Sequence, residues 1–171
     1  MRAPPCDRLG MTGALVGAIL AARHSAGAAR GGAVDLERKR EHQMIDHIGL
    51  AVSDLSKSRA FYAAALKPLG IELVMEVTAE QTGAGAHSGF GVANKPFFWI
   101  GDHASPCSGV HVAFSAESRA QVVQFYREAL KAGGKSNGEP GLRPHYHESY
   151  YGAFVFDPDG NNIEAVCHKP E

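Results

Sequence analysis

The sequence has few cysteines, and their spacing does not suggest a disulfide scaffold or a structural zinc site. Its 171 residues include three cysteines, Cys6, Cys107 and Cys167, with no CxxC spacing. Small disulfide-rich domains and zinc ribbons need an even or closely spaced set. A reducing compartment, and therefore a cytoplasmic location, is the simpler expectation.

Long apolar runs and an excess of one charge are also missing. No apolar stretch approaches the roughly 20 residues of a transmembrane helix, so the sequence does not predict a membrane protein. The 17 basic and 18 acidic residues give a formal net charge of -1 at pH 7, which argues against a nucleic-acid partner. The 44% of hydrophobic residues is typical of a globular domain with a core. The composition is also compatible with a small-molecule substrate.

The first 43 residues differ from the rest of the chain. They combine several arginines, a short apolar run over Met11–Ala22 and small residues around Gly27, as in secretory signals or organellar transit peptides. The alternatives are a disordered extension or an upstream start codon, with Met44 as the working start. A regular pattern begins at Ile45. We therefore expect one domain over 44–168, with a first module over 45–101 and a second over 109–168.

An internal repeat is the most informative feature of the sequence. At a constant offset of 64 residues, His47 aligns with His111 without a gap, and seven residues in all are identical between the two copies. The other matching residues of the first copy are Phe61, Tyr62, Ala65, Leu66, Lys67 and Gly70. A repeat of this length indicates two copies of one supersecondary unit.

Both copies have the same predicted order of elements. Each starts with an alternating strand, over 45–52 and 110–116, and continues with an amphipathic helix that ends at glycine. Short strands divided by Gly and Pro follow, at 71–77, 89–93 and 96–101 in the first copy, and at 151–156 and 161–167 in the second, around a tight turn at 157–160. The sequence therefore predicts an α+β fold of two tandem βαβββ modules.

His47 and His111 are metal-ligand candidates because the repeat places them at the same point of both modules. Each begins a strand on the face that carries small residues, which leaves space above the sheet where a core would have large side chains. Glu164 is the expected third ligand, since alternation in its strand turns Ile163 and Ala165 inward and Glu164 toward the other face. A carboxylate among apolar neighbours needs a partner, and a divalent cation would supply one.

Two His and one carboxylate leave coordination positions open to substrate, as in sites for Fe, Mn, Zn, Ni or Co. The equivalent strand of the first module carries Trp99 near the position where a fourth ligand would stand, and we expect Trp99 to form a wall of the pocket and to contact the substrate. We therefore expect one divalent metal ion in an open site.

The segment 141–152 concentrates further polar and aromatic side chains just before the strand pair that holds Glu164. Arg143 is a candidate anion-binding residue. Acid–base roles are expected for His145, Tyr146 and His147, and substrate contacts for Tyr150 and Tyr151. The alternative is a polar surface loop. His24, His42 and His87 follow no such pattern, and His103 and His168 are weaker candidates.

With these residues in place, the sequence resembles the vicinal oxygen chelate superfamily, which includes glyoxalase I, bleomycin-resistance proteins and extradiol dioxygenases. The resemblance covers about 45–168 and rests on four stretches: Asp46–Leu55, Phe61-Tyr62, Val110–Phe114 and Phe156–Glu164, the last containing DPDG followed by NxIE. It implies a cup-shaped mixed sheet around a central cavity, a metal-bound substrate with two oxygen ligands, and a homodimer by family analogy.

The departures from the family patterns narrow the expected activity. Trp99 stands where glyoxalase I has another metal ligand, and Phe154 stands where extradiol dioxygenases have a catalytic Tyr, although His145 fits their preceding His. The expected function is a glyoxalase-like metal-dependent enzyme with lyase, isomerase or addition chemistry on a small oxygen-chelating substrate. The alternatives are an extradiol-type dioxygenase and a non-catalytic binder of small molecules or antibiotics.

Overall fold

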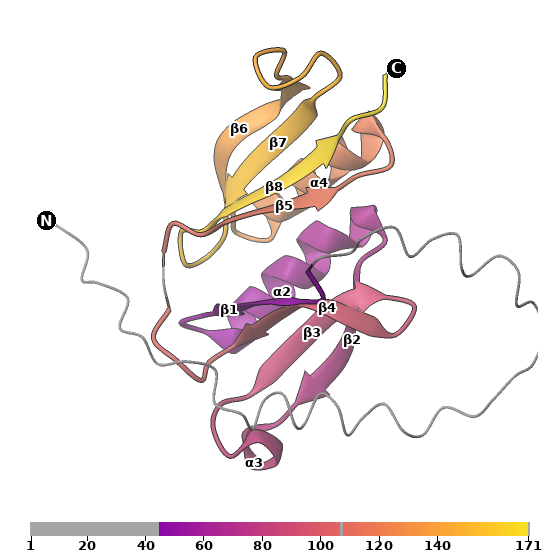
Figure 1. The fold of residues 1–171 in the computed structure, drawn as a ribbon. Coiled ribbons are helices and arrows are strands. Elements are labelled where there is room, and N and C mark those ends of the chain that lie inside the picture. Colours follow the sequence, from indigo (N-terminus) through magenta and orange to yellow (C-terminus); the bar gives the residue numbers. More distant parts are fainter. Residues whose placement is uncertain (1–44, 107, 171) are drawn as a thin grey trace, which may run out of the picture.

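The computed structural model describes residues 45–106 and 108–170, in which two similar modules follow each other along the chain (Figure 1). The expectations for 1–43 lie outside the described residues. The elements of the first module are β1 (Ile48–Ala51), α2 (Leu55–Leu66), η2 (Lys67–Leu69), β2 (Glu72–Val77), α3 (Ala79–Thr82), β3 (His87–Val92) and β4 (Lys95–Gly101). Those of the second are β5 (His111–Ser115), α4 (Arg119–Lys131), β6 (Lys135–Leu142), β7 (Tyr151–Phe156) and β8 (Asn162–Cys167).

Each module contains a four-stranded mixed sheet with the same topology. The strand orders are β1-β4-β3-β2 and β5-β8-β7-β6, and in each sheet the first strand of the module runs parallel to its last strand. The remaining pairs are antiparallel. The predicted tandem βαβββ modules are therefore confirmed.

Local sequence signals account for the ends of the long helices. The side chain of Asp54 accepts a hydrogen bond from the Lys57 amide at the start of α2, and Ser118 does the same for Gln121 at the start of α4. Gly70 and Gly133 follow the two helical segments with φ of 74° and 95°, a conformation that glycine adopts at little cost.

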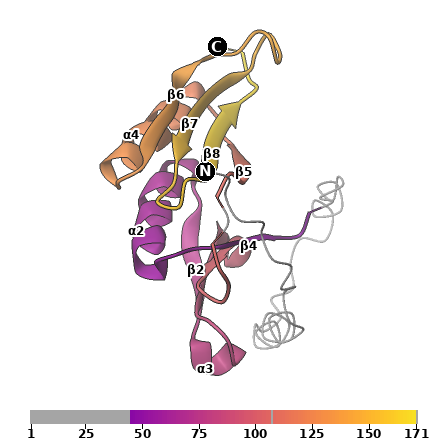
Figure 2. The same cartoon turned by 90° about the vertical axis from the view of Figure 1, so that its left-hand side faces the viewer.

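The two modules share one hydrophobic core, which lies on the helix side of the sheets. Helices α2 and α4 contact each other and lie on the same side of the molecule, with the strands on the other side (Figure 2). Phe61 of α2 and Phe125 of α4 are both fully buried in this core, and the Phe98 and Phe114 rings meet edge to face across the modules. Within residues 45–106 and 108–170, neither long helix covers the opposite faces of the two sheets.

Two elements were not expected from the sequence. β6 has the sequence KSNGEPGL, which lacks apolar alternation, and it forms by irregular pairing with β7. The short α3 begins with a capping box between Thr78 and Gln81. Among the described residues, no helix is long and apolar enough to cross a bilayer.

Candidate metal and substrate site

Glu164 lies on the face of sheet β5-β8-β7-β6 that is turned away from α4. Its neighbours in β8, Ile163 and Ala165, belong to the core, and alternation directs Glu164 to the opposite face. The carboxylate side chain is nevertheless 1% exposed. A carboxylate buried to this degree needs polar partners.

His111 and Tyr150 supply those partners. Nε2 of His111 lies 3.0 Å from Oε2 of Glu164, and the Tyr150 hydroxyl donates a 2.6 Å hydrogen bond to Oε1. Burial, followed by the hydrogen bond and charge of Glu164, raises the pKa of Tyr150 well above its usual value. The tyrosine therefore keeps its proton and acts as a donor, while His111, with a side chain 53% exposed, faces solvent.

Gly152 makes room for the Tyr150–Glu164 hydrogen bond. A Cβ atom at this position would lie 2.9 Å from Oε1 of Glu164 and 3.1 Å from Cε1 of Tyr150, both closer than an ordinary van der Waals contact. The backbone of β7 thus approaches the carboxylate directly. Any larger residue would push one of the two partners away.

Arg143 and Phe154 extend the site along the sheet. Phe154 of β7 pairs with Glu164 in the sheet register, and its ring centroid lies 6.3 Å from that of His111. The Arg143 guanidinium lies over the Phe154 ring at 5.5 Å and donates to the backbone oxygen of Glu139. We call His111, Arg143, Tyr150, Phe154 and Glu164 the Glu164 site. It combines a positive charge, a flat apolar surface and a buried carboxylate.

The loop between β6 and β7 carries His145, Tyr146 and His147, which are all exposed. The Tyr146 ring packs edge to face on Tyr150 at 5.2 Å and is therefore the nearest of the three to the Glu164 site. His145 packs on Tyr146, and Nδ1 of His147 accepts a hydrogen bond from the Ser149 amide. Their expected acid–base roles stay predictions.

Tyr151 lies on the other face of the sheet. It pairs with Cys167 and packs against the hydrophobic core, with the Arg119 guanidinium 5.2 Å from its ring. A substrate contact from Tyr151 does not fit this placement. The cause is the alternation of β7, which directs Tyr151, Ala153 and Val155 inward.

His47 lies in the first module, just before β1. Its Nδ1 is 3.0 Å from Oδ1 of Asp46, and this hydrogen bond, together with Lys95, holds the pKa of Asp46 below its usual value. The aspartate is thus an anionic acceptor that leaves Nε2 of His47 available. Metal-binding histidines are oriented by second-shell carboxylates in the same way.

Trp99 occupies the position in the first module that Glu164 has in the second. Gly49, two residues after His47, pairs with Trp99, and Ala113, two residues after His111, pairs with Glu164. Trp99 is 3% exposed, and a Cβ on Gly89 would meet its ring at 2.9 Å, so the indole lies across β3. The first module therefore contributes one candidate ligand and an aromatic wall.

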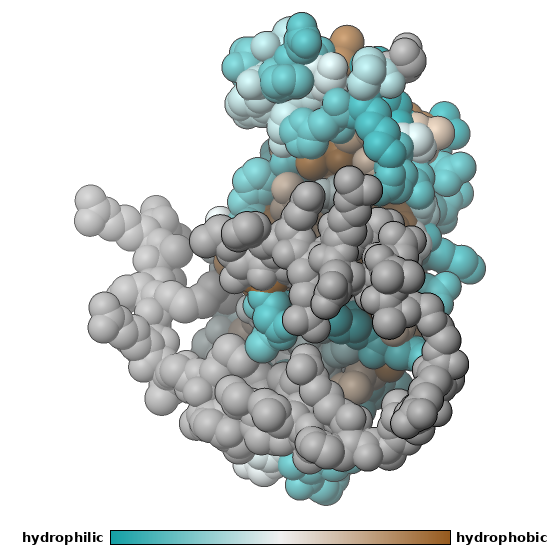
Figure 3. Space-filling model, turned by 45° about the vertical axis from the view of Figure 1, so that its right-hand side comes forward, coloured by the Kyte–Doolittle hydropathy of each residue, from teal (hydrophilic) through white to brown (hydrophobic). Residues whose placement is uncertain are grey.

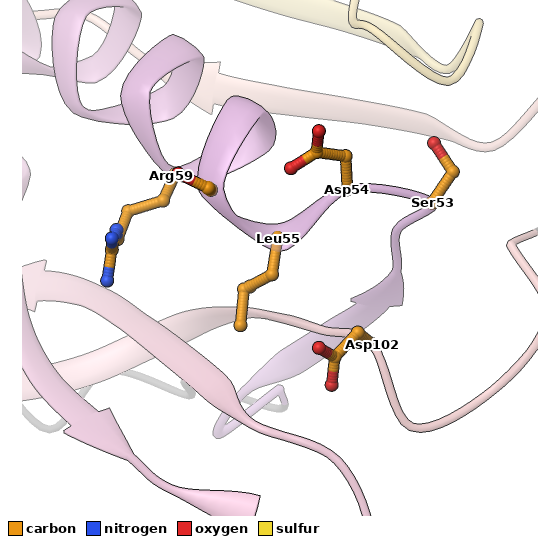
Figure 4. A pocket seen from close by; sticks show the side chains of 6 residues that line it. Ser53, Asp54, Leu55, Arg59 and Asp102 are labelled. Carbon is orange, nitrogen blue, oxygen red and sulfur yellow. The ribbon is translucent and has the colours of Figure 1, made fainter.

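The structure brings His111 and Glu164 together but does not add His47 to them. Across residues 45–106 and 108–170, no group of three or more His, Cys, Asp or Glu side chains is placed to hold a metal ion. A pocket of about 470 Å³ lies elsewhere, at the start of α2, and is lined by Asp54, Arg59 and Asp102 among others (Figure 4). It shares no residue with the Glu164 site. The visible surface of the second module, at the top of Figure 3, is mostly hydrophilic.

A family model matches most of the described chain. The model named "Glyoxalase/Bleomycin resistance protein/Dioxygenase superfamily" matches residues 44–165. The chain belongs to this superfamily. Members with known structures include enzymes, and the two βαβββ modules are the fold expected of the superfamily.

Solved structures of the superfamily have the same fold. A glyoxalase/bleomycin resistance protein from Albidiferax ferrireducens is 28% identical, with a TM-score of 0.60, and the match covers 74% of this chain and 99% of that one. Glyoxalase I from Zea mays is 20% identical, with a TM-score of 0.54, and the match covers 74% of this chain and 45% of the maize chain. No curated protein matches the sequence. The maize likeness shows the fold alone.

Proposed function

We propose that this chain is a glyoxalase-like metal-dependent enzyme that acts on a small oxygen-chelating substrate. The observation that carries the proposal is the nearly completely buried Glu164 carboxylate, with the half-exposed His111 imidazole 3.0 Å from one of its oxygens. An imidazole nitrogen and a carboxylate oxygen are ligands shared by Fe, Mn, Zn, Ni and Co sites. The donor set therefore fits a divalent metal ion.

Tyr150 determines how Glu164 would bind the ion. Its hydrogen bond occupies Oε1, so Oε2, the oxygen that faces His111, is the one left for the metal. When bound, the ion would act as a Lewis acid toward substrate oxygens. Arg143 would hold an anionic group of the substrate above Phe154, and Tyr146, with His145 and His147, would exchange protons at the edge of the site.

His47 is the proposed third ligand, and we propose that it comes from a second copy of the chain. Within the described residues of one chain no three candidate ligands meet, while the Asp46–His47 pair leaves Nε2 of His47 ready to bind. In a homodimer with two-fold symmetry, His47 of each chain would complete the His111–Glu164 pair of the other. The dimer would thus hold two sites.

Mixing two defective variants tests this arrangement. His47→Ala and Glu164→Ala each remove one ligand from every site of a homodimer, but a heterodimer of the two variants regains one complete site. If subunits mix at random, about a quarter of the sites recover, as measured by metal content after gel filtration. No recovery in a mixture that contains proven heterodimers would contradict the shared site.

Metal analysis and a substrate screen test the activity itself. We expect a divalent metal bound through His111 and Glu164 in the purified protein, and turnover within a panel of dicarbonyls, epoxides and catechols supplied with each metal in turn. Phe154 beside Glu164 does not favour dioxygenase activity on catechols, because it lacks the hydroxyl of the tyrosine that extradiol dioxygenases have at this position. If the His111→Ala variant contains as much metal as the wild type, the result would instead support a non-catalytic binding protein.

A further inference from the structure

We propose that His87 and His103 form a second binding site for a divalent transition-metal ion, separate from the Glu164 site. His87 is the first residue of β3 and is 3% exposed, while His103 follows the end of β4 by two residues and is exposed. Nε2 of His87 lies 2.8 Å from Nδ1 of His103, and the two rings stack with centroids 4.6 Å apart.

Glycines make room for this pair. A Cβ on Gly101 would lie 2.3 Å from Cδ2 of His87 and 3.0 Å from Nδ1 of His103. A Cβ on Gly85 would lie 2.4 Å from Oδ1 of Asp102 and 2.5 Å from the backbone nitrogen of His103. The two imidazoles therefore meet only because the backbone beside them carries no side chains.

The nitrogen positions suit an ion that binds both rings. Zinc–nitrogen bonds of 2.0–2.1 Å in tetrahedral geometry place two nitrogens about 3.3 Å apart, about 0.5 Å more than the separation here. His103 lies in an exposed connection and can supply that movement, whereas His87 is fixed in β3. Water would complete the coordination, and imidazole pairs favour Zn, Cu or Ni over Mg or Ca.

A hydrogen bond between the two rings is the competing explanation for the short distance. In that arrangement one proton lies between the two nitrogens, in the place that the ion would take. The other nitrogen of His87 is buried in both arrangements, so titration with Zn(II) decides between them.

The His87–His103 pair is remote from His47 along the sheet. His87 pairs with Gly101, whereas Trp99 pairs with Gly49 and His47 precedes Gly49 by two residues. In the sheet register, the positions of His87 and His47 are thus about four residues, or about 13 Å, apart along the strand direction. His111 and Glu164 belong to the other sheet. An ion at His87 and His103 would tie the connection between β4 and β5 to the first sheet.

Calorimetric titration of the full chain with Zn(II) tests the proposal. His103→Ala changes an exposed side chain and should remove one equivalent of bound Zn(II), while Ser105→Ala, in the same connection, should titrate as the wild type does. Zn(II) should also raise the Tm of the wild type more than that of His103→Ala, because an ion that binds the folded state stabilises it.

The outcome separates this site from the proposed function. Glu164→Gln should remove a different equivalent of bound Zn(II), so the variant that combines His103→Ala and Glu164→Gln should lose both equivalents. If His103→Ala binds as much Zn(II) as the wild type with the same affinity, the second site is overturned, whatever Glu164→Gln does. If only His103→Ala loses an equivalent, the second site stands and the Glu164 site is the one contradicted.

Discussion

The hydroxyl of Tyr62 in α2 donates a 2.6 Å hydrogen bond to Oδ2 of Asp157, which begins the turn between β7 and β8. Both residues are buried, and they belong to different modules. Asp157 also accepts hydrogen bonds from the amides of Asp159 and Asn161 and therefore holds the turn that leads to Glu164. The first module thus supports the strand on which the Glu164 site is built.

Removing the Tyr62 hydroxyl should destabilise the protein. Tyr62→Phe leaves a buried carboxylate oxygen with one donor fewer, and we expect the free energy of unfolding to fall by about 1–3 kcal/mol in urea denaturation. Tyr126→Phe is the control, because its hydroxyl donates a hydrogen bond to Ser136 at the exposed surface, and we expect a smaller loss. Equal losses in the two variants would contradict a special role for the contact.

The same contact predicts a dependence of stability on alkaline pH. Burial, and then the charge of Asp157, raise the pKa of Tyr62 well above its usual value. In the unfolded chain this tyrosine loses its proton near pH 10, while the folded protein retains it. The stabilisation is therefore complete below about pH 10 and is lost as the pH rises further. Denaturation curves should show a steeper alkaline loss for the wild type than for Tyr62→Phe, and parallel losses would refute the assignment.

Replacing the buried carboxylate should abolish metal binding at the Glu164 site without unfolding the protein. Glu164→Gln keeps an acceptor for Tyr150 but presents a neutral amide to the metal, so we expect the affinity for that equivalent to fall at least about tenfold. Metal competition with a chromogenic chelator measures the change. Glu72→Gln, on an exposed part of β2, is the matched control and should bind as the wild type does.

A single methyl group at position 152 should have a similar effect through Glu164. Gly152→Ala places its Cβ 2.9 Å from Oε1, so the carboxylate or Tyr150 has to move, and we expect weaker metal binding together with lower stability. Gly49→Ala adds the same methyl group in β1, where the nearest atom, Cβ of Trp99, is 4.0 Å away. If both variants lose metal affinity equally, crowding of Glu164 is not the cause.

Arg143 should determine the affinity for anionic substrates. With a substrate from the screen that carries a negative charge, Arg143→Gln should raise KM about tenfold and change kcat less, because the guanidinium contacts a non-reacting group. Arg127→Gln removes the same charge from the exposed surface of α4 and should leave KM unchanged. A pure kcat effect would place Arg143 at the reacting atoms instead.

Much of the fold could be predicted because the repeat and the helix signals are local. Asp54, Ser118 and the glycines after each helix are readable in sequence, and so is the alternation that turns Glu164 away from the core. β6 could not be predicted, since its pairing with β7 and not its own residues makes it a strand. The repeat predicts that Trp99 takes the position in the first module that Glu164 has in the second, and the strand register supports this.

The contacts of the candidate site were less accessible to sequence reasoning. Tyr150 directly precedes β7 and reaches Glu164 past Gly152, whereas Tyr151, its neighbour, turns inward. His87 and His103 are 16 positions apart, and only the β3–β4 register, which pairs His87 with Gly101, brings them together. Once the β3–β4 hairpin is aligned, Gly101 is the partner of His87, and His103 follows Gly101 by two residues, so a search of aligned hairpins would have found the pair.

The hydrophobic core shared by α2 and α4 has a consequence for the history of the chain. A βαβββ unit on its own would expose Phe61 and Tyr62, or Val122 and Phe125, to water. Either half expressed separately should therefore associate with another half or aggregate, and the whole domain should unfold in one cooperative transition. After duplication, each half became the other's missing packing layer, and so the two sheet faces were able to diverge, one toward Trp99 and the other toward Glu164.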